Sequence, residues 1–239
     1  MTSYHSLEQQ LASTLGLTRR PVAIAFLDSP PAGVSKFTGT VPSGCSFWRL
    51  ASEGRVFFTV PEDHYNCPLG SYTHNIPLPL GRAAELGETL GLMADIGYLR
   101  MDEVPGIPVL PKTPAAVVYA PLGDTPVDPD VVIFQGPAAR VMLLQEAATS
   151  ARVSATLNTL GRPTCMALPA ALAHGVVMST GCVGNRVYTG LEEGELYAAA
   201  PGRDLAALAR TCGTIASANA KLKEYHERRR LQLTREPAW

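Results

Sequence analysis

The sequence predicts an α/β (or α+β) fold in which a mixed β-sheet is covered by helices, and three observations support it. Short apolar stretches with the composition of buried strands alternate with segments of helical periodicity. Charged residues make up 17% of the chain, below the usual quarter, so the interior should be large relative to the surface. The 21 glycines and 20 prolines indicate many turns, which argues against a helix bundle. We expect one domain over residues 1–239.

The first half is expected to contain three helices and two strands. Leu7, Leu11 and Leu15 recur at helical spacing before Gly16, which predicts a helix over residues 6–16. The other elements follow from β-forming runs, turn residues and a helical apolar face. They are a strand over 21–27, a helix over 46–52, a strand over 55–60, an irregular segment over 61–79 and a helix over 82–98.

The second half resembles a restart after a Pro-broken connector over 102–114. Pro137 suits the first position of a helix over 138–152, and Asp204 is expected to cap a C-terminal helix over 204–230. Between them we expect a short helix that begins near Cys165 and ends at Gly175, and a turn over 181–185. The strands are expected over 115–120, 130–135, 176–180 and within 190–200, and the polar tail over 228–239 should fray or contact a partner chain.

Two stretches of the chain read alike, which suggests an internal duplication with halves at about 17–100 and 114–200. In each half a cysteine opens a short helix, a glycine ends it, a strand follows, and a second cysteine lies in a glycine-containing turn. These cysteines are Cys45 and Cys67 in the first half and Cys165 and Cys182 in the second. If the duplication is real, a pseudo-twofold arrangement would bring the four sulfurs to a common interface; a chance resemblance is the alternative.

The four cysteines suit a metal centre. A thiol at a helix N-terminus meets unpaired backbone N–H groups and the positive end of the helix dipole, both of which favour thiolate. Four thiolates would satisfy tetrahedral zinc or the corners of a [4Fe–4S] cluster. Because the chain has no Cys-x-x-Cys pair, reactive thiols and buried core cysteines remain open as alternatives. Cys212, within the C-terminal helix pattern, is interpreted as a core residue.

Three further residues are candidates for catalytic roles. His64 and His74 flank Cys67 and would act as acid, base or extra ligand beside a thiolate; the alternative is a solvated or locally bonded loop histidine. Arg186 follows Cys182 by four residues and would hold a carboxylate or phosphate, with a structural salt bridge as the alternative.

Charge and composition exclude several classes of partner. The net charge of -1 argues against nucleic acid or an anionic membrane as the main partner. The longest stretch without Asp, Glu, Lys or Arg, residues 163–185, contains prolines, glycines and a histidine, so we expect no membrane helix there. We find neither a secretory signal nor a dinucleotide or P-loop fingerprint. The five cysteines in a chain of this size indicate a reducing, cytoplasmic compartment.

Several motifs together resemble the domain-of-unknown-function 169 family. The motifs are PVAIAF, DHYNCPLGSYTH, PDVVIFQGPAARVMLL and GCVGNRVYTGL followed by AAAPGRDL, and the similarity runs from about Leu15 to about Leu208. The resemblance implies a cytoplasmic, single-domain protein of archaeal and bacterial type. It also implies recurrent cysteines at the positions of Cys45, Cys67, Cys165 and Cys182. It supplies no reaction.

Three functions are compatible with these residues. The first is a metal- or iron–sulfur-binding redox protein, an oxidoreductase if it is an enzyme, with His64, His74 and Arg186 binding substrate beside the cluster. The second is a module that binds a small molecule or a partner and whose cysteines hold structural zinc or lie in the core. The third is an enzyme that uses Cys67 as its nucleophile. We expect a small-molecule substrate or a redox partner protein, and the aliphatic C-terminal helix makes a homodimer plausible.

Overall fold

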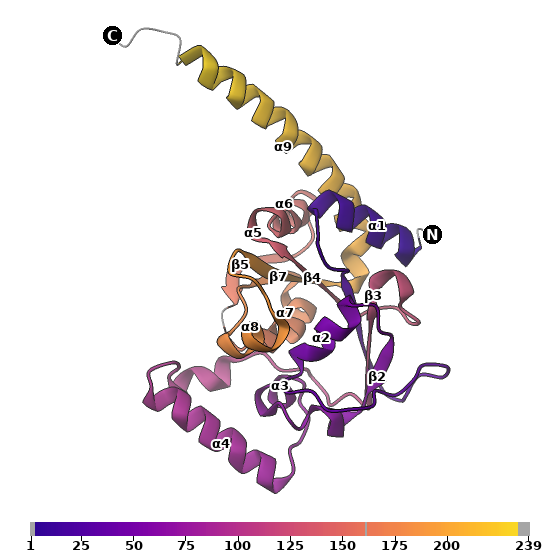
Figure 1. Cartoon of the computed structure of the whole chain (residues 1–239), viewed down its shortest axis with the longest axis vertical. Coiled ribbons are helices and arrows are strands. Elements are labelled where there is room, and N and C mark those ends of the chain that lie inside the picture. Colours follow the sequence, from indigo (N-terminus) through magenta and orange to yellow (C-terminus); the bar gives the residue numbers. More distant parts are fainter. Residues whose placement is uncertain (1–2, 161, 234–239) are drawn as a thin grey trace.

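A seven-stranded mixed sheet forms the middle layer of the protein, with helices on both faces (Figure 1). The computed structural model describes residues 3–160 and 162–233. The strand order is β2-β3-β1-β4-β7-β6-β5, and every neighbouring pair is antiparallel except β5 and β6. This confirms the predicted fold class. The strands are β1 (Val22–Leu27), β2 (Phe57–Thr59), β3 (Ala116–Pro121), β4 (Val131–Pro137), β5 (Ala155–Leu160), β6 (Val176–Ser179) and β7 (Glu195–Pro201).

Each face of the sheet carries its own apolar cluster. In β1, Ile24 belongs to the cluster under α2 and α7, whereas its neighbour Ala23 belongs to the cluster under α1, α6 and α9. Because helices cover both faces, the central strands read as almost continuous apolar runs. The helices are α1 (Tyr4–Leu15), α2 (Cys45–Ser52), α3 (Pro68–Thr73), α4 (Leu80–Asp95), α5 (Ala138–Val141), α6 (Leu143–Ser150), α7 (Ala167–His174), α8 (Val183–Thr189) and α9 (Leu205–Leu233).

The pairing of strands repeats between the two halves of the sheet. The order reads outward from the central β1–β4 pair as β1-β3-β2 on one side and as β4-β7-β6 on the other. The registers match as well: Val22 pairs with Pro121 and Val131 with Pro201, while Phe57 pairs with Tyr119 and Val177 with Ala199. The central pair has the symmetric register Val22↔Ile133, Ala23↔Val132 and Ile24↔Val131. The sheet is therefore pseudo-twofold in its pairing; that it arose by duplication stays a prediction.

Three local predictions were wrong. The expected turn over 181–185 begins helix α8, which ends at the left-handed Gly190 and packs against α2. The segment 61–79, expected to be irregular, contains α3, which packs against the neighbouring α4 and also against Thr164–Met166, almost a hundred residues further on. The helix expected over 138–152 is divided into α5 and α6, and Pro137 is the last residue of β4 rather than the first of a helix. For α8 and α3, packing against distant segments accompanies the departure from the local pattern.

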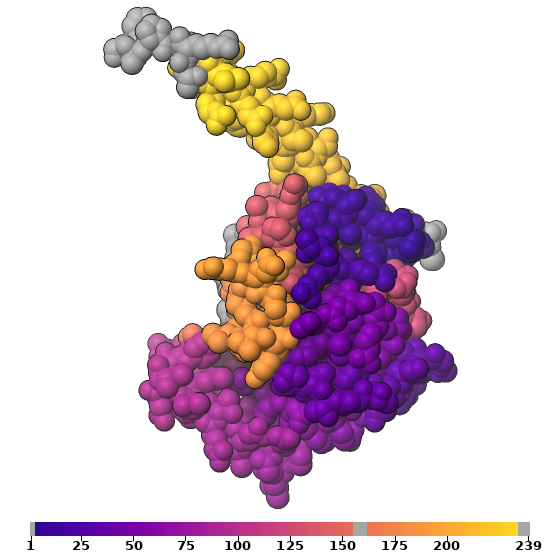
Figure 2. Space-filling view, viewed as in Figure 1, coloured from indigo at the N-terminus to yellow at the C-terminus, as the bar shows by residue number. Residues whose placement is uncertain are grey.

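Two helices extend away from the sheet. Leu90 is the one buried residue of helix α4, so the helix lies largely outside the core although it has an apolar face. Helix α9 packs against α1 and α6 with its first turns and then projects from the body, leaving Leu222 and Tyr225 about half exposed (Figures 1 and 2). In the described part of the chain, no helix combines the length and the apolarity that crossing a bilayer requires. The last six residues of the predicted polar tail lie outside the described residues.

Candidate functional site

Each of the four predicted cysteines lies at the start of a short helical element. Cys45 is the first residue of α2, and Cys165 lies in the 3-10 helix η4 (Thr164–Met166), which leads directly into α7. Cys67 and Cys182 are the N-cap residues of α3 and α8. In both halves, one cysteine thus precedes a strand and the other follows it, as the sequence predicts.

The helix starts of the two halves interleave. Helix α2 of the first half packs against α8 of the second (Figure 1). Helix α3 of the first half packs against η4 of the second. The thiol of Cys165 donates to the carbonyl of Leu69 at 3.8 Å, and the backbone N–H of Cys182 donates to Thr164 Oγ1 at 2.6 Å. Figure 2 shows the segment around α8, in orange, against the purple surface of the first half. This cross-packing brings residues from distant parts of the chain to one place.

The four sulfurs interact electrostatically in all six possible pairs. Burial raises the pKa of Cys45 well above its ordinary value, and the charges of Cys165, Cys67 and Cys182 raise it further. Burial also raises the pKa of Cys67 and of Cys165; Cys182 adds to the effect in both cases, and Cys67 adds to it at Cys165. We call these four residues the cysteine centre. Cys212 takes no part, because burial alone raises its pKa to about 11 and its thiol donates to a carbonyl of α6.

Hydrogen-bond donors oppose the effect of burial at three of these sulfurs. The backbone N–H groups of Gly44 and Gly70 lower the pKa of Cys67, and the Thr73 hydroxyl lowers that of Cys165. A Cβ at Gly70 would lie 2.9 Å from Cys67 Sγ, so the close approach of this sulfur to the helix requires glycine. The side chain of Asn185 lies near enough to Cys45 to favour its thiolate. Donors of this kind stabilise anionic sulfur.

Cysteines at equivalent positions in the two halves have similar solvent exposure. Cys45 and Cys165 are each 5% exposed, while Cys67 and Cys182 are partly exposed. The centre therefore has a deep side and a side nearer to solvent. Among the described residues, no three His, Cys, Asp or Glu side chains come close enough together to hold a single metal ion.

His64 and His74 are core residues, although the segment that carries them has the composition of a loop. They are 1% and 2% exposed, and their rings lie 5.3 Å apart between centroids. Burial lowers the pKa of His64 far below its ordinary value, and that of His74 to about 4. Both rings are therefore neutral at pH 7.

Several buried polar atoms around the cysteine centre have no hydrogen-bond partner of normal geometry: His64 Nδ1, His74 Nε2, Tyr119 Oη and both amide atoms of Asn185. Sequence reasoning missed Tyr119 and Asn185. The available signals were a tyrosine within an otherwise apolar strand and an asparagine three residues after Cys182. Burial and the charges of three cysteines raise the pKa of Tyr119, so it remains a neutral phenol that can donate.

Arg186 is occupied by the fold. Its guanidinium donates to the carbonyls of Thr180, Leu191, Glu192 and Glu195, and so ties the turn before α8 to the chain that leads into β7. These bonds use most of its donors. The predicted role in holding a carboxylate or phosphate gains no support from them.

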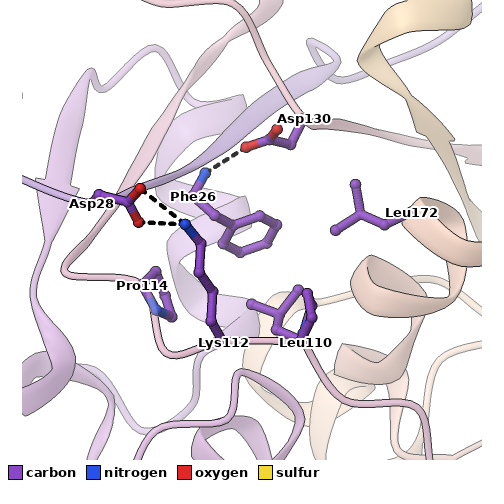
Figure 3. Close-up of a pocket in the computed structure, with 8 residues that line it drawn as sticks. Phe26, Asp28, Leu110, Lys112, Pro114, Asp130 and Leu172 are labelled. Carbon is purple, nitrogen blue, oxygen red and sulfur yellow. Dashed lines mark hydrogen bonds and ion pairs between the residues drawn. The ribbon is translucent and has the colours of Figure 1, made fainter.

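Two surface pockets lie outside the cysteine centre. The first encloses about 170 Å³ and is lined by Phe26, Leu172 and a rim that includes the ion pair between Asp28 and Lys112 (Figure 3). The Phe26 ring faces this cavity and also contacts His74 edge to face at 5.8 Å. The second, of about 430 Å³, lies near Arg19 and the loop after α8.

Comparison with known proteins identifies the family but supplies no reaction. No curated protein and no solved structure matches the chain. The model of the domain-of-unknown-function 169 family, described as uncharacterised ArCR, matches residues 10–211. This match covers most of the sequence and includes both halves of the sheet and the whole cysteine centre. The chain belongs to the domain-of-unknown-function 169 family.

Proposed function

We propose that this protein is a redox protein that binds an iron–sulfur cluster of the [4Fe–4S] type through Cys45, Cys67, Cys165 and Cys182. One observation carries the proposal: four thiols, two from each half of the sheet, are coupled in all six pairs within one buried region. Thiolates from four separate positions suit the four irons of such a cluster, each of which takes one cysteine.

The protonation of the thiols supports a cationic occupant. Burial and mutual repulsion raise the pKa values of Cys45, Cys67 and Cys165, so without a cation these thiols are protonated at neutral pH. Iron would reverse this balance, because a bound metal deprotonates a coordinating thiol outright. The N–H and O–H donors at Cys67 and Cys165 would then stabilise anionic sulfur and raise the reduction potential of the cluster.

A cluster fits these residues better than the two alternatives. Four thiolates on one tetrahedral zinc lie about 3.8 Å apart, given zinc–sulfur bonds of about 2.3 Å, and no described group is that compact. A cluster spreads its ligands more widely, because each cysteine binds a different iron. As for a nucleophile, the raised pKa of Cys67 works against the thiolate that such chemistry requires.

The proposal extends to partners and location. The partly exposed side of the centre, at Cys67 and Cys182, is where a redox partner protein or a small-molecule substrate would exchange electrons with the cluster. All five cysteines are free, which suits the reducing cytoplasm. The half-exposed apolar residues of α9 suit a homodimer.

The test is reconstitution with iron and sulfide under anaerobic conditions. We expect brown protein with about four irons and four acid-labile sulfides per chain, and a visible absorption that bleaches on reduction. Cys212→Ser is the matched control, because this cysteine is buried but lies outside the centre.

Colourless, iron-free wild-type protein from such a preparation would refute the proposal. A colourless protein that holds one zinc per chain would favour the structural-zinc alternative instead. Rapid alkylation of Cys67 alone near neutral pH would favour the nucleophile.

A further inference from the structure

Each of the two buried histidines has one ring nitrogen anchored to the protein. His74 Nδ1 lies 2.7 Å from the carbonyl of Gly70, and because a carbonyl only accepts, Nδ1 carries the proton. His64 Nε2 lies 2.8 Å from Thr59 Oγ1, whose own hydroxyl donates to the carbonyl of Val117. Thr59 therefore accepts from His64, and Nε2 carries the proton of that ring. Both tautomers are set by these neighbours.

The opposite nitrogen of each ring is a bare lone pair without a partner. These atoms are His64 Nδ1 and His74 Nε2, and each ring is at most 2% exposed. A buried acceptor without a partner is unfavourable, so two such atoms, on rings whose centroids lie 5.3 Å apart, call for an occupant. A neutral imidazole whose other N–H is held by a carbonyl or hydroxyl is the usual arrangement of a metal ligand.

We propose that His64 Nδ1 and His74 Nε2 bind one divalent transition-metal ion of the zinc or ferrous type, beside the cysteine centre and separate from its cluster. Two imidazoles on one tetrahedral ion have ring centroids about 5 Å apart, and these rings are 5.3 Å apart. The unpartnered hydroxyl of Tyr119, whose ring lies 6.5 Å from that of His64, is available to hydrogen-bond the ion's remaining ligand.

The surroundings favour a cation at this position. The backbone N–H of Cys67 donates to the carbonyl of His64, and a Cβ at Gly44 would lie 3.9 Å from His64 Nδ1. The backbone N–H of Gly44 also donates to the sulfur of Cys67, so Gly44 lies next to both His64 Nδ1 and the Cys67 thiol. An ion bound by the two imidazoles would lie near the cysteine centre and would gain from the negative charge of thiolates bound to a cluster there.

The occupant is small. The two pockets described above are not lined by His64, His74 or Tyr119, and both histidines are at most 2% exposed, which suits an ion rather than a larger molecule. Phe26 lines the first pocket (Figure 3) and its ring also contacts His74, so this pocket is the side from which an ion would reach the histidines.

The test adds Zn²⁺ to the full-length, cluster-reconstituted protein, removes unbound metal by desalting, and measures zinc per chain together with zinc X-ray absorption. We expect one zinc with two imidazole nitrogens. His64→Gln keeps the bond to Thr59 and His74→Asn keeps the bond to Gly70, while each removes the free nitrogen. Each should weaken zinc binding more than about 100-fold, since second-shell changes alone cost 10–100-fold. Thr59→Val tests that second shell, and His174→Gln, on the surface, is the control.

The outcomes separate this proposal from the cluster. Iron and sulfide content reports on the cluster, while zinc bound through nitrogen reports on the histidines. If no cluster forms but nitrogen-bound zinc persists, the proposed function fails and the histidine site stands. Folded wild-type protein that takes up no zinc, or only sulfur-bound zinc, would overturn the site and leave an ordered water as its occupant. The wild-type spectrum decides even if a variant does not fold.

Discussion

The two halves of the sheet share their strand pairing but differ in what they insert between the strands. In the first half, residues 74–115 connect α3 to β3 and include α4; in the second, only residues 190–194 connect α8 to β7. What is common to both halves is the sheet register and the two cysteines at helix starts. What differs lies outside the centre or, like His64 and His74, belongs to one half alone. The shared register and helix starts position the four cysteines, whereas the insertion with α4 and the two histidines distinguish the first half from the second.

The largest expected effect tests whether both halves are needed. Cys45→Ser and Cys165→Ser occupy corresponding positions, and each is expected to abolish stable cluster loading, because under the proposed function both residues would supply a buried ligand. Iron and sulfide analysis after anaerobic reconstitution measures this. If one variant retains full iron while the other loses it, the two halves are not equivalent and the comparison fails.

Acid should destabilise the protein through the two buried histidines of the first half. His74 has a folded pKa of about 4, below its unfolded value of about 6.5, so between these pH values the unfolded state binds the extra proton. Stability is therefore full above pH 6.5 and falls with pH, by about 2 kcal/mol at pH 5 and about 3 kcal/mol at pH 4. His64 acts in the same direction.

Urea unfolding of metal-free protein at pH 7 and pH 5 checks this prediction, and His74→Asn should flatten the pH dependence. A free energy of unfolding that is equal at both pH values would mean that the two histidines are not buried in the folded protein.

Arginines of the two halves should differ in their contribution to stability. Arg186→Gln should lower the free energy of unfolding by about 2 kcal/mol, because charged hydrogen bonds to carbonyls are lost. Arg82→Gln, in the insertion of the first half, should cost less than about 0.5 kcal/mol, because its ion pair with Glu85 is exposed. Denaturant titration measures both. An unchanged stability of Arg186→Gln, with weakened anion binding, would instead favour the anion role.

The smallest expected change in stability concerns the glycines beside the second cysteine of each half. Gly70→Ala gains helix propensity but forces Cys67 Sγ to move, so we expect a net change below about 1 kcal/mol together with reduced iron content. Gly184→Ala meets only ordinary contact with Tyr188 at 3.7 Å and should retain its iron. Equal iron content in both variants would show that the position of Cys67 is less constrained than described.

Much of the fold and the choice of cysteines could be predicted from the sequence. Apolar strands such as β1 and β4 are recognisable because both of their faces are buried, and the two cysteine–helix–strand–cysteine patterns point to the same four residues. Strand β5 was missed, since its sequence ATLNTL is neither a continuous apolar run nor a regular alternation, and it lies at the edge of the sheet.

The rest depends on contacts between distant segments. The polar composition around His64 and His74 is typical of a loop, and both are buried because α3 packs against η4. The register of β3 decides that Tyr119 faces the cysteines rather than α9. Arg186 donates to backbone carbonyls, and because every residue has one, the sequence does not indicate which carbonyls will be its partners.

The central pair of the sheet joins β1 to β4, two strands more than a hundred residues apart. During synthesis, β1 can pair with β3 along one edge, but its other edge stays unpaired until β4, residues 131–137, has left the ribosome. Until then the nascent chain carries an open apolar strand edge, which is a template for association with other chains. Because the proposed cluster would take ligands from both halves, we expect it to be inserted after this edge has closed.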